Sequence, residues 1–152
     1  MLFRSQRVES LIKETFPDAR LGRLDMDTAR TGSGLTKILK DFSDGKLDIL
    51  LGTQMIAKGL DFPNATLVGI INADLGLHLP DFRAGERIFQ LIYQASGRAG
   101  RGIKPGEVVI QTYVPDNPVI KNAAKLDMMK YYNIALSERN ELKYPPFSWL
   151  AK

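Results

Sequence analysis

The side chains best suited to chemistry lie in residues 94–102. This segment reads Gln-Ala-Ser-Gly-Arg-Ala-Gly-Arg-Gly, so Arg98 and Arg101 stand three residues apart, each directly after a glycine. Glycine destabilises a helix interior by about 1 kcal/mol relative to alanine, so the glycines do not serve helix stability. They allow close backbone approach, and guanidinium forks match phosphate groups. The segment predicts an anion site, for phosphate. The structural alternative is a pair of arginines stabilised by the helix dipole, worth about 0.3–1 kcal/mol.

A second polar motif occupies residues 51–61, which read Leu-Gly-Thr-Gln-Met-Ile-Ala-Lys-Gly-Leu-Asp. It directly follows an apolar run. Its glycines permit close backbone approach, and Thr53 and Gln54 carry groups that donate to phosphate or sugar oxygens. Asp61 can accept a hydrogen bond from a ribose hydroxyl. Taken alone, the motif is better explained as a tight strand-to-helix turn with Asp61 as a cap.

Composition sets the class of protein. The chain has 152 residues, 44% of them hydrophobic and 25% charged, which is typical of one ordinary globular domain. It lacks both the roughly 18-residue apolar run of a membrane-spanning helix and a signal-peptide pattern. It has no cysteine, which excludes disulfides and thiolate zinc sites within this chain. We expect a cytoplasmic protein.

The net charge of +4 is concentrated in one stretch. Residues 83–104 contain five basic residues against one acidic residue, which accounts for the whole excess. Such a concentration favours a surface that faces a polyanion. An ordinary solvated face is an equally good explanation on charge alone.

Apolar spacing predicts alternating helices and strands. Helices are expected at 7–16, 33–42 (with Ser33 as a possible cap), 55–58 and 83–95, and strands at 19–24, 47–51, 66–72 and 106–113, with a loop at 73–82. Strands 47–51 and 66–72 are expected to be buried on both faces. The alternation predicts an α/β layered fold with a mostly parallel sheet. Ligands gather at the carboxyl ends of such strands, where Thr53 and Asn72 stand.

Residues 114–152 differ in character. Residues 119–141 are expected to be helical, and Tyr-Pro-Pro-Phe at 144–147 ends the helix. We therefore predict one domain at 1–113 and, at 114–152, a helical connector with the start of a C-terminal domain. The only histidine, His78, is interpreted as a loop residue rather than a base. Tyr144, Phe147 and Trp149 can stack on bases, but contacts with another domain are favoured.

Taken together, the motifs resemble the second RecA-like lobe of superfamily 2 helicases. Residues 52–61 resemble motif V, and residues 94–101, Gln-x-x-Gly-Arg-x-Gly-Arg, resemble motif VI. The block 72–87, with residues 23–27 and 144–147, narrows the resemblance to the primosomal replication-restart helicases. It covers nearly the whole chain. The implied fold is a RecA-like, P-loop NTPase-type, three-layer sandwich with a mainly helical extension.

The resemblance implies an ATP-dependent motor that unwinds DNA 3′ to 5′ in replication restart and primosome assembly. ATP lies between two lobes, and Arg98 and Arg101 are implied to be arginine fingers, which can be worth about 10³–10⁵ in rate. Gln94 is implied to couple the γ-phosphate to lobe closure. The implied DNA contacts come from Gly52, Thr53, Gln54 and Lys58, whereas Gly59 and Asp61 lie nearer the nucleotide.

The same resemblance implies partners and cofactors. ATP and Mg²⁺ are expected to be bound mainly by the first lobe, and zinc is expected in the full-length protein but not in this chain. Expected partners are forked or single-stranded DNA, the first lobe, primosome proteins and single-strand-binding proteins. The expected location is the bacterial cytoplasm, at the nucleoid.

Some family features are missing from the sequence. It has neither Gly-x-x-x-x-Gly-Lys-[Ser/Thr] nor an Asp-Glu-x-His box, and residues 1–5 match no motif. We therefore expect a fragment that lacks the first lobe, is inactive alone and binds ATP negligibly. Two alternatives remain: a non-enzymatic nucleic-acid-binding or adaptor domain, and a lobe of another superfamily 2 translocase.

Overall fold

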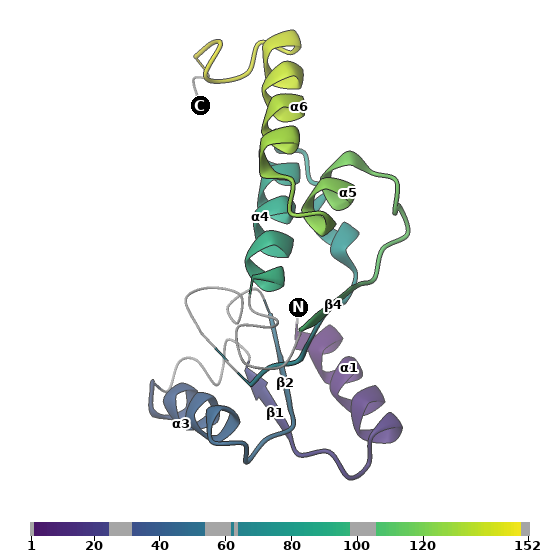
Figure 1. The fold of residues 1–152 in the computed structure, drawn as a ribbon, viewed down its shortest axis with the longest axis vertical. Helices are drawn as coiled ribbons and strands as arrows, with labels where there is room; N and C mark the ends of the chain where they lie inside the picture. The colour runs from purple at the N-terminus through teal and green to yellow at the C-terminus, as the bar shows by residue number, and fades with distance from the viewer. Residues whose placement is uncertain (1, 25–31, 54–61, 63, 98–105, 150–152) are drawn as a thin grey trace. The chain divides into compact units, whose positions relative to one another are not determined.

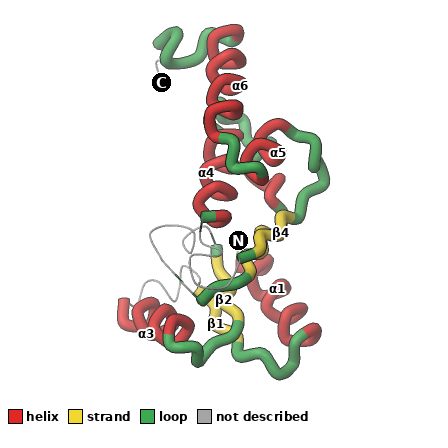
Figure 2. Tube along the Cα trace, viewed as in Figure 1, coloured by secondary structure: helices red, strands yellow, loops and turns green. Residues whose placement is uncertain are grey.

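The structure, a computed structural model, describes residues 2–24, 32–53, 62, 64–97 and 106–149. The chain divides into two compact units, Met1–Phe62 and Pro63–Lys152, called unit 1 and unit 2 below. Figure 1 labels most of the helices and strands, and Figure 2 distinguishes helix, strand and loop by colour. Each unit is described by itself.

Unit 1 contains a strand–helix–strand motif. Its elements are α1 (Leu2–Thr15), β1 (Leu21–Leu24), α3 (Gly32–Ser43) and β2 (Ile49–Gly52). The two strands pair in parallel, with Leu21 opposite Ile49 and Leu24 opposite Gly52. Helix α3 packs against β1, and α1 packs against β2.

Gly22 explains how closely α3 approaches β1. A Cβ atom added at Gly22 would lie 2.6 Å from Leu47 Cδ1 and 3.3 Å from Ile38 Cγ2, both closer than ordinary contact. Glycine therefore permits the side chains of α3 and of the segment before β2 to pack directly on the strand backbone. Phe42 of α3 in turn meets Phe62 edge to face, with ring centroids 5.0 Å apart.

Unit 2 contains a second strand–helix–strand motif followed by two helices. Its elements are β3 (Leu67–Ile70), the 3₁₀ helix η1 (Ala73–Gly76), α4 (Ala84–Ser96), β4 (Glu107–Ile110), α5 (Pro118–Ala124) and α6 (Met128–Glu141). Strands β3 and β4 pair in parallel, with Leu67 opposite Glu107. Helix α4 packs against β3 and α5, and α5 packs against α6.

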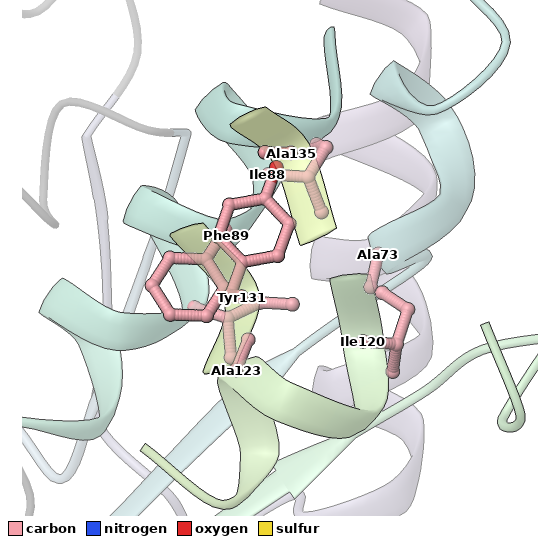
Figure 3. Packing of buried hydrophobic residues seen from close by; sticks show 8 residues of the cluster. Ala73, Ile88, Phe89, Ile120, Ala123, Tyr131 and Ala135 are labelled. Carbon is pink, nitrogen blue, oxygen red and sulfur yellow. The ribbon is translucent and has the colours of Figure 1, made fainter. Parts of the chain in front are cut away.

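The core of unit 2 is built around a stack of two rings. Phe89 of α4 and Tyr131 of α6 lie against each other (Figure 3). Their ring centroids are 4.1 Å apart and their planes 6° apart, so the rings are stacked. Phe89 and Ile92 are the largest fully buried side chains among the described residues. The buried cluster consists of Ala73, Ile88, Phe89, Ile92, Ile120, Ala123, Tyr131 and Ala135. It joins η1, α4, α5 and α6 into one packed body.

The structure confirms the α/β class, the parallel strand pairing and the helix predicted at 83–95. The single helical stretch predicted at 119–141 is wrong: Leu126, with φ of 55°, separates α5 from α6. Helix α3 begins at Gly32, and the prediction of Ser33 as a cap stays a prediction. Strands β3 and β4 alternate between exposed and half-buried residues, so the prediction of a strand buried on both faces at 66–72 is also wrong.

Two further points concern organisation. The boundary predicted between residues 113 and 114 stays a prediction, whereas the compact units divide between residues 62 and 63. None of the helices in the described ranges is long and apolar enough to cross a membrane. The helical turn predicted at 55–58 lies outside the described residues.

Candidate functional site

Gln94 stands in the last turn of α4 and is exposed. The helix forms because Ile88, Ile92 and Ala95 recur at helical spacing and are buried on one face. Gln94 falls on the opposite, solvent-facing side. Its amide both donates and accepts hydrogen bonds, so it can contact a polar ligand while the rest of the helix holds its position.

Helix α4 ends at Gly97. The Gly97 N–H donates to the Tyr93 carbonyl at 3.1 Å, and its φ of −69° is right-handed, so this position does not use glycine's access to positive φ. The sequence continues into Arg98 and Arg101, the two predicted arginine fingers. Both lie outside the described residues.

In unit 1, Gly52 is the last residue of β2 and is paired with Leu24 of β1. Thr53 follows the strand directly and is exposed. Its hydroxyl therefore stands at the carboxyl end of a parallel strand pair, where ligands of α/β proteins gather. The other residues predicted in this motif, Gln54, Lys58, Gly59 and Asp61, lie outside the described residues.

The residues predicted for the nucleotide and for DNA fall in both units, each described by itself. Thr53 belongs to unit 1 and Gln94 to unit 2. A group of three or more Asp, Glu or His residues able to hold a metal ion is absent from the described part of the chain.

The strand ends of unit 2 carry a polar network around Asp74, which is only 6% exposed. The Thr112 hydroxyl donates to Asp74 Oδ1, and the Tyr113 N–H donates to Oδ2 at 2.8 Å. These two hydrogen bonds hold the pKa of Asp74 below its usual range. The carboxylate is therefore ionised and directed inward. It fixes the start of the loop that leads into α4.

Asn72 extends this network. It adopts a left-handed conformation, with φ of 55°, and its N–H donates to Gln111 Oε1 at 3.2 Å. The next N–H, of Ala73, donates to the Gln111 carbonyl at 3.0 Å. The backbone N–H groups of Asn72 and Ala73 both donate to Gln111. These hydrogen bonds join the segments that follow β3 and β4.

Other predicted residues have mixed outcomes. His78 lies in a turn and is exposed, as interpreted from the sequence. Tyr144 stacks on Phe82 within this chain, with centroids 5.2 Å apart, so another domain is not needed to explain it. Trp149 is fully exposed and Phe147 is 47% exposed; their role in contacts with another domain stays a prediction.

Two residues important to the geometry were missed by sequence reasoning. Asp74 left a weak signal, because it is a lone carboxylate in the mostly apolar run 70–77. Arg139 left none: it contacts Glu86, 53 positions earlier, and the Pro145 carbonyl. Local spacing does not report pairs so far apart in the chain.

Comparisons with known proteins agree with the motif assignment. The family described as "Helicase conserved C-terminal domain" matches residues 3–102. "Replication restart protein PriA" of Bacillus subtilis is 51% identical over 147 residues, which are 97% of this chain and 18% of that protein. The proteins of the same name in Chlamydia trachomatis and Haemophilus influenzae are 47% and 41% identical, with 97% of this chain and 20% of each relative covered. The chain spans about a fifth of the length of these relatives.

The matching region contains the strand–helix–strand motif of unit 1, then β3, η1 and α4 of unit 2, and the glycine-arginine segment after α4. Its α/β architecture with parallel strands is that of a RecA-like lobe. The chain belongs to the helicase conserved C-terminal domain family.

Proposed function

We propose that this chain is the second motor lobe of an ATP-dependent DNA helicase that acts in replication restart. The observation that carries the proposal is the exposed Gln94 in the last turn of α4, three residues before the sequence Gly-Arg-Ala-Gly-Arg, in a chain of the helicase C-terminal family. The similarity to proteins named for replication restart supports the proposal that this helicase acts in replication restart. The lobe works with a first lobe that supplies the phosphate loop and most of the Mg²⁺ ligands.

In this proposal ATP is the substrate and the arginines act on its phosphates. Arg98 and Arg101 stabilise negative charge that develops on the γ-phosphoryl group, as planar guanidinium groups do well. Gln94 hydrogen-bonds to the γ-phosphate or its attacking water and so couples hydrolysis to lobe closure. Helix α4 supports Gln94, because the opposite face of the helix is buried against the core of unit 2. Asp61 and Gly59 lie nearer the nucleotide.

DNA is proposed to bind at the strand end of unit 1. Thr53 is exposed there and follows Gly52, whose lack of a side chain permits backbone approach to phosphate. Gln54 and Lys58 complete the proposed DNA contacts. The proposed polarity is 3′ to 5′, the proposed partners are primosome and single-strand-binding proteins, and the proposed location is the nucleoid. In the full-length protein, zinc is bound outside this chain.

The test separates the two roles in the full-length protein. Arg98→Ala should reduce DNA-stimulated ATP hydrolysis by about 10³-fold or more, because one finger carries much of the transition-state charge, while DNA binding stays intact. Thr53→Val, which keeps the side-chain shape, should raise the DNA concentration needed for half-maximal stimulation and leave DNA-independent hydrolysis unchanged. Arg7→Ala removes an exposed arginine from α1 and serves as the control.

Retained ATP hydrolysis in Arg98→Ala would refute the arginine-finger assignment. A full-length protein without ATP hydrolysis, but with DNA binding, would favour an adaptor domain instead. The 152-residue chain alone should bind ATP negligibly by calorimetry, since the phosphate-loop motif is absent from its sequence. Tight binding by the chain alone would contradict the division of work between the lobes.

A further inference from the structure

Arg139 holds together three segments of unit 2. It stands in the last turn of α6, and its guanidinium donates to the carboxylate of Glu86, in the first turn of α4. It also donates to the Pro145 carbonyl at 2.6 Å. Its Cζ lies 4.8 Å from the centre of the Phe82 ring. The loop before α4, the first turn of α4 and the segment after α6 therefore meet at one side chain.

The surroundings make this contact stronger than a surface ion pair. The Arg139 side chain is only 16% exposed and that of Glu86 is 26% exposed, so solvent screens the pair less than it would at the surface. Phe82 is also stacked by Tyr144, with ring planes 22° apart. Two guanidinium nitrogens donate to different acceptors while Arg139 also contacts a ring, a combination that the point charge of lysine cannot reproduce.

Helix α4 connects this contact to the proposed site. It has 13 residues, so it is about 20 Å long. Arg139 contacts the first turn of α4 through Glu86, whereas Gln94 stands in the last turn. Because α4 is a continuous helix buried along one face, a displacement of its first turn is transmitted to its other end.

We propose that Arg139 is a positioning residue that ties the segment after α6 to the first turn of α4 and thereby fixes the end of α4 that carries Gln94. The inference rests on the proposed function, because the orientation of α4 affects turnover only if Gln94 and Arg98 act on the nucleotide. Arg139 itself touches no substrate. Through Arg139, the rate of ATP hydrolysis depends on the position of the segment after α6.

The experiment uses the full-length protein and measures DNA-stimulated ATP hydrolysis well below the temperature of unfolding. Arg139→Gln should lower kcat by about 10- to 100-fold, since a misplacement near 1 Å can cost about 10² in rate. KM for ATP and the affinity for DNA should stay unchanged. Arg139→Lys keeps the charge but loses the planar fork, and should give an intermediate kcat.

Lys121→Ala is the matched control. Lys121 pairs with Asp116 in the same unit, but its side chain is 54% exposed and that of Asp116 is 93% exposed. This variant should keep the wild-type kcat. If Arg139→Gln lowers only the unfolding temperature and keeps the wild-type kcat per folded molecule, Arg139 is merely stabilising and the proposal is wrong.

Tyr144→Leu gives an independent test should Arg139→Gln fail to fold. It removes the stack on Phe82 and leaves the ion pair with Glu86 in place, so kcat should fall by less than in Arg139→Gln. Wild-type kcat in Tyr144→Leu would overturn the tie between the segment after α6 and α4. If Arg98→Ala keeps its activity, the proposed function fails. If Arg98→Ala is inactive while the Arg139 and Tyr144 variants are normal, only this inference fails.

Discussion

The two units each contain a strand–helix–parallel-strand motif, yet they stabilise it differently. In unit 2, α4 packs between its strand pair and α5, around the Phe89–Tyr131 stack. In the described part of unit 1, Leu24 and Phe62 are the buried apolar residues and most strand positions are half-buried. Unit 1 relies more on charge: Arg20 binds Asp48 through two nitrogens, and Arg23 pairs with Glu9 at 2.6 Å.

This difference concerns function as well as stability. The helix that carries Gln94 is held by buried apolar contacts, which are insensitive to salt and resist displacement. The strand end that carries Thr53 follows a motif held partly by the exposed Arg20–Asp48 pair, which salt screens. A site that must position an arginine finger needs the more rigid support. The following predictions test that contrast, from the largest effect to the smallest.

Phe89→Ala should destabilise unit 2 by about 3–5 kcal/mol, because it removes one ring of the central stack and leaves a cavity. Hydrogen exchange measured peptide by peptide should show lost protection in α4, α5 and α6. Met129→Ala, at a position that is 71% exposed on α6, should stay within about 0.5 kcal/mol of wild type. Equal effects of the two variants would contradict the core described for unit 2.

Gly22→Ala should destabilise unit 1 by about 1–3 kcal/mol, because the added methyl group overpacks the contact with Leu47 and Ile38. Gly69 in β3 is the matched control: among the described residues, nothing lies within 4 Å of a Cβ added there. Gly69→Ala should be neutral or stabilise by about 0.4–1 kcal/mol through the unfolded state. Urea unfolding of both variants measures the difference. A larger loss of stability in Gly69→Ala than in Gly22→Ala would contradict this prediction.

Tyr131→Phe tests the buried stack through pH. Burial, followed by the charges of Glu86 and Glu138, raises the pKa of the Tyr131 phenol. Above about pH 10 the unfolded chain releases the phenol proton while the folded chain retains it, so wild-type stability falls as pH rises. Tyr131→Phe should lack this contribution to the loss of stability at high pH. The urea unfolding midpoints of both proteins at about pH 8 and about pH 11 measure this contribution. An equal drop in midpoint in wild type and variant would contradict the prediction.

Asp48→Asn should have the smallest effect, because the pair with Arg20 is exposed. Hydrogen bonds from Arg20 hold the pKa of Asp48 well below its usual range. The stabilisation is therefore present above about pH 4 and is lost as pH falls through the lowered pKa. The stability difference between wild type and variant should shrink on acidification, as measured by urea unfolding. Asp116→Asn in unit 2, where Asp116 is 93% exposed, is the control; a difference that grows in acid would contradict the prediction.

Several elements followed directly from local patterns. The helix predicted at 83–95 occurs at Ala84–Ser96, because its apolar residues recur at the spacing that buries one helical face. The parallel pairing followed from strands alternating with helices. The break between α5 and α6 was missed because neither glycine nor proline marks it: Leu126 takes the left-handed conformation, and Asp127 caps the next helix by accepting from the Lys130 N–H.

By itself, the sequence determined the α/β class, the helix at 83–95, and the two motifs that carry the family resemblance. These are local properties, read from neighbouring residues. Only the tertiary structure decided that Asp74 is buried against Thr112 and that Arg139 joins Glu86 to the segment after α6. The physical reason is that burial and long-range hydrogen bonding depend on which segments the packed core brings together, and residues far apart in the chain leave no common local pattern.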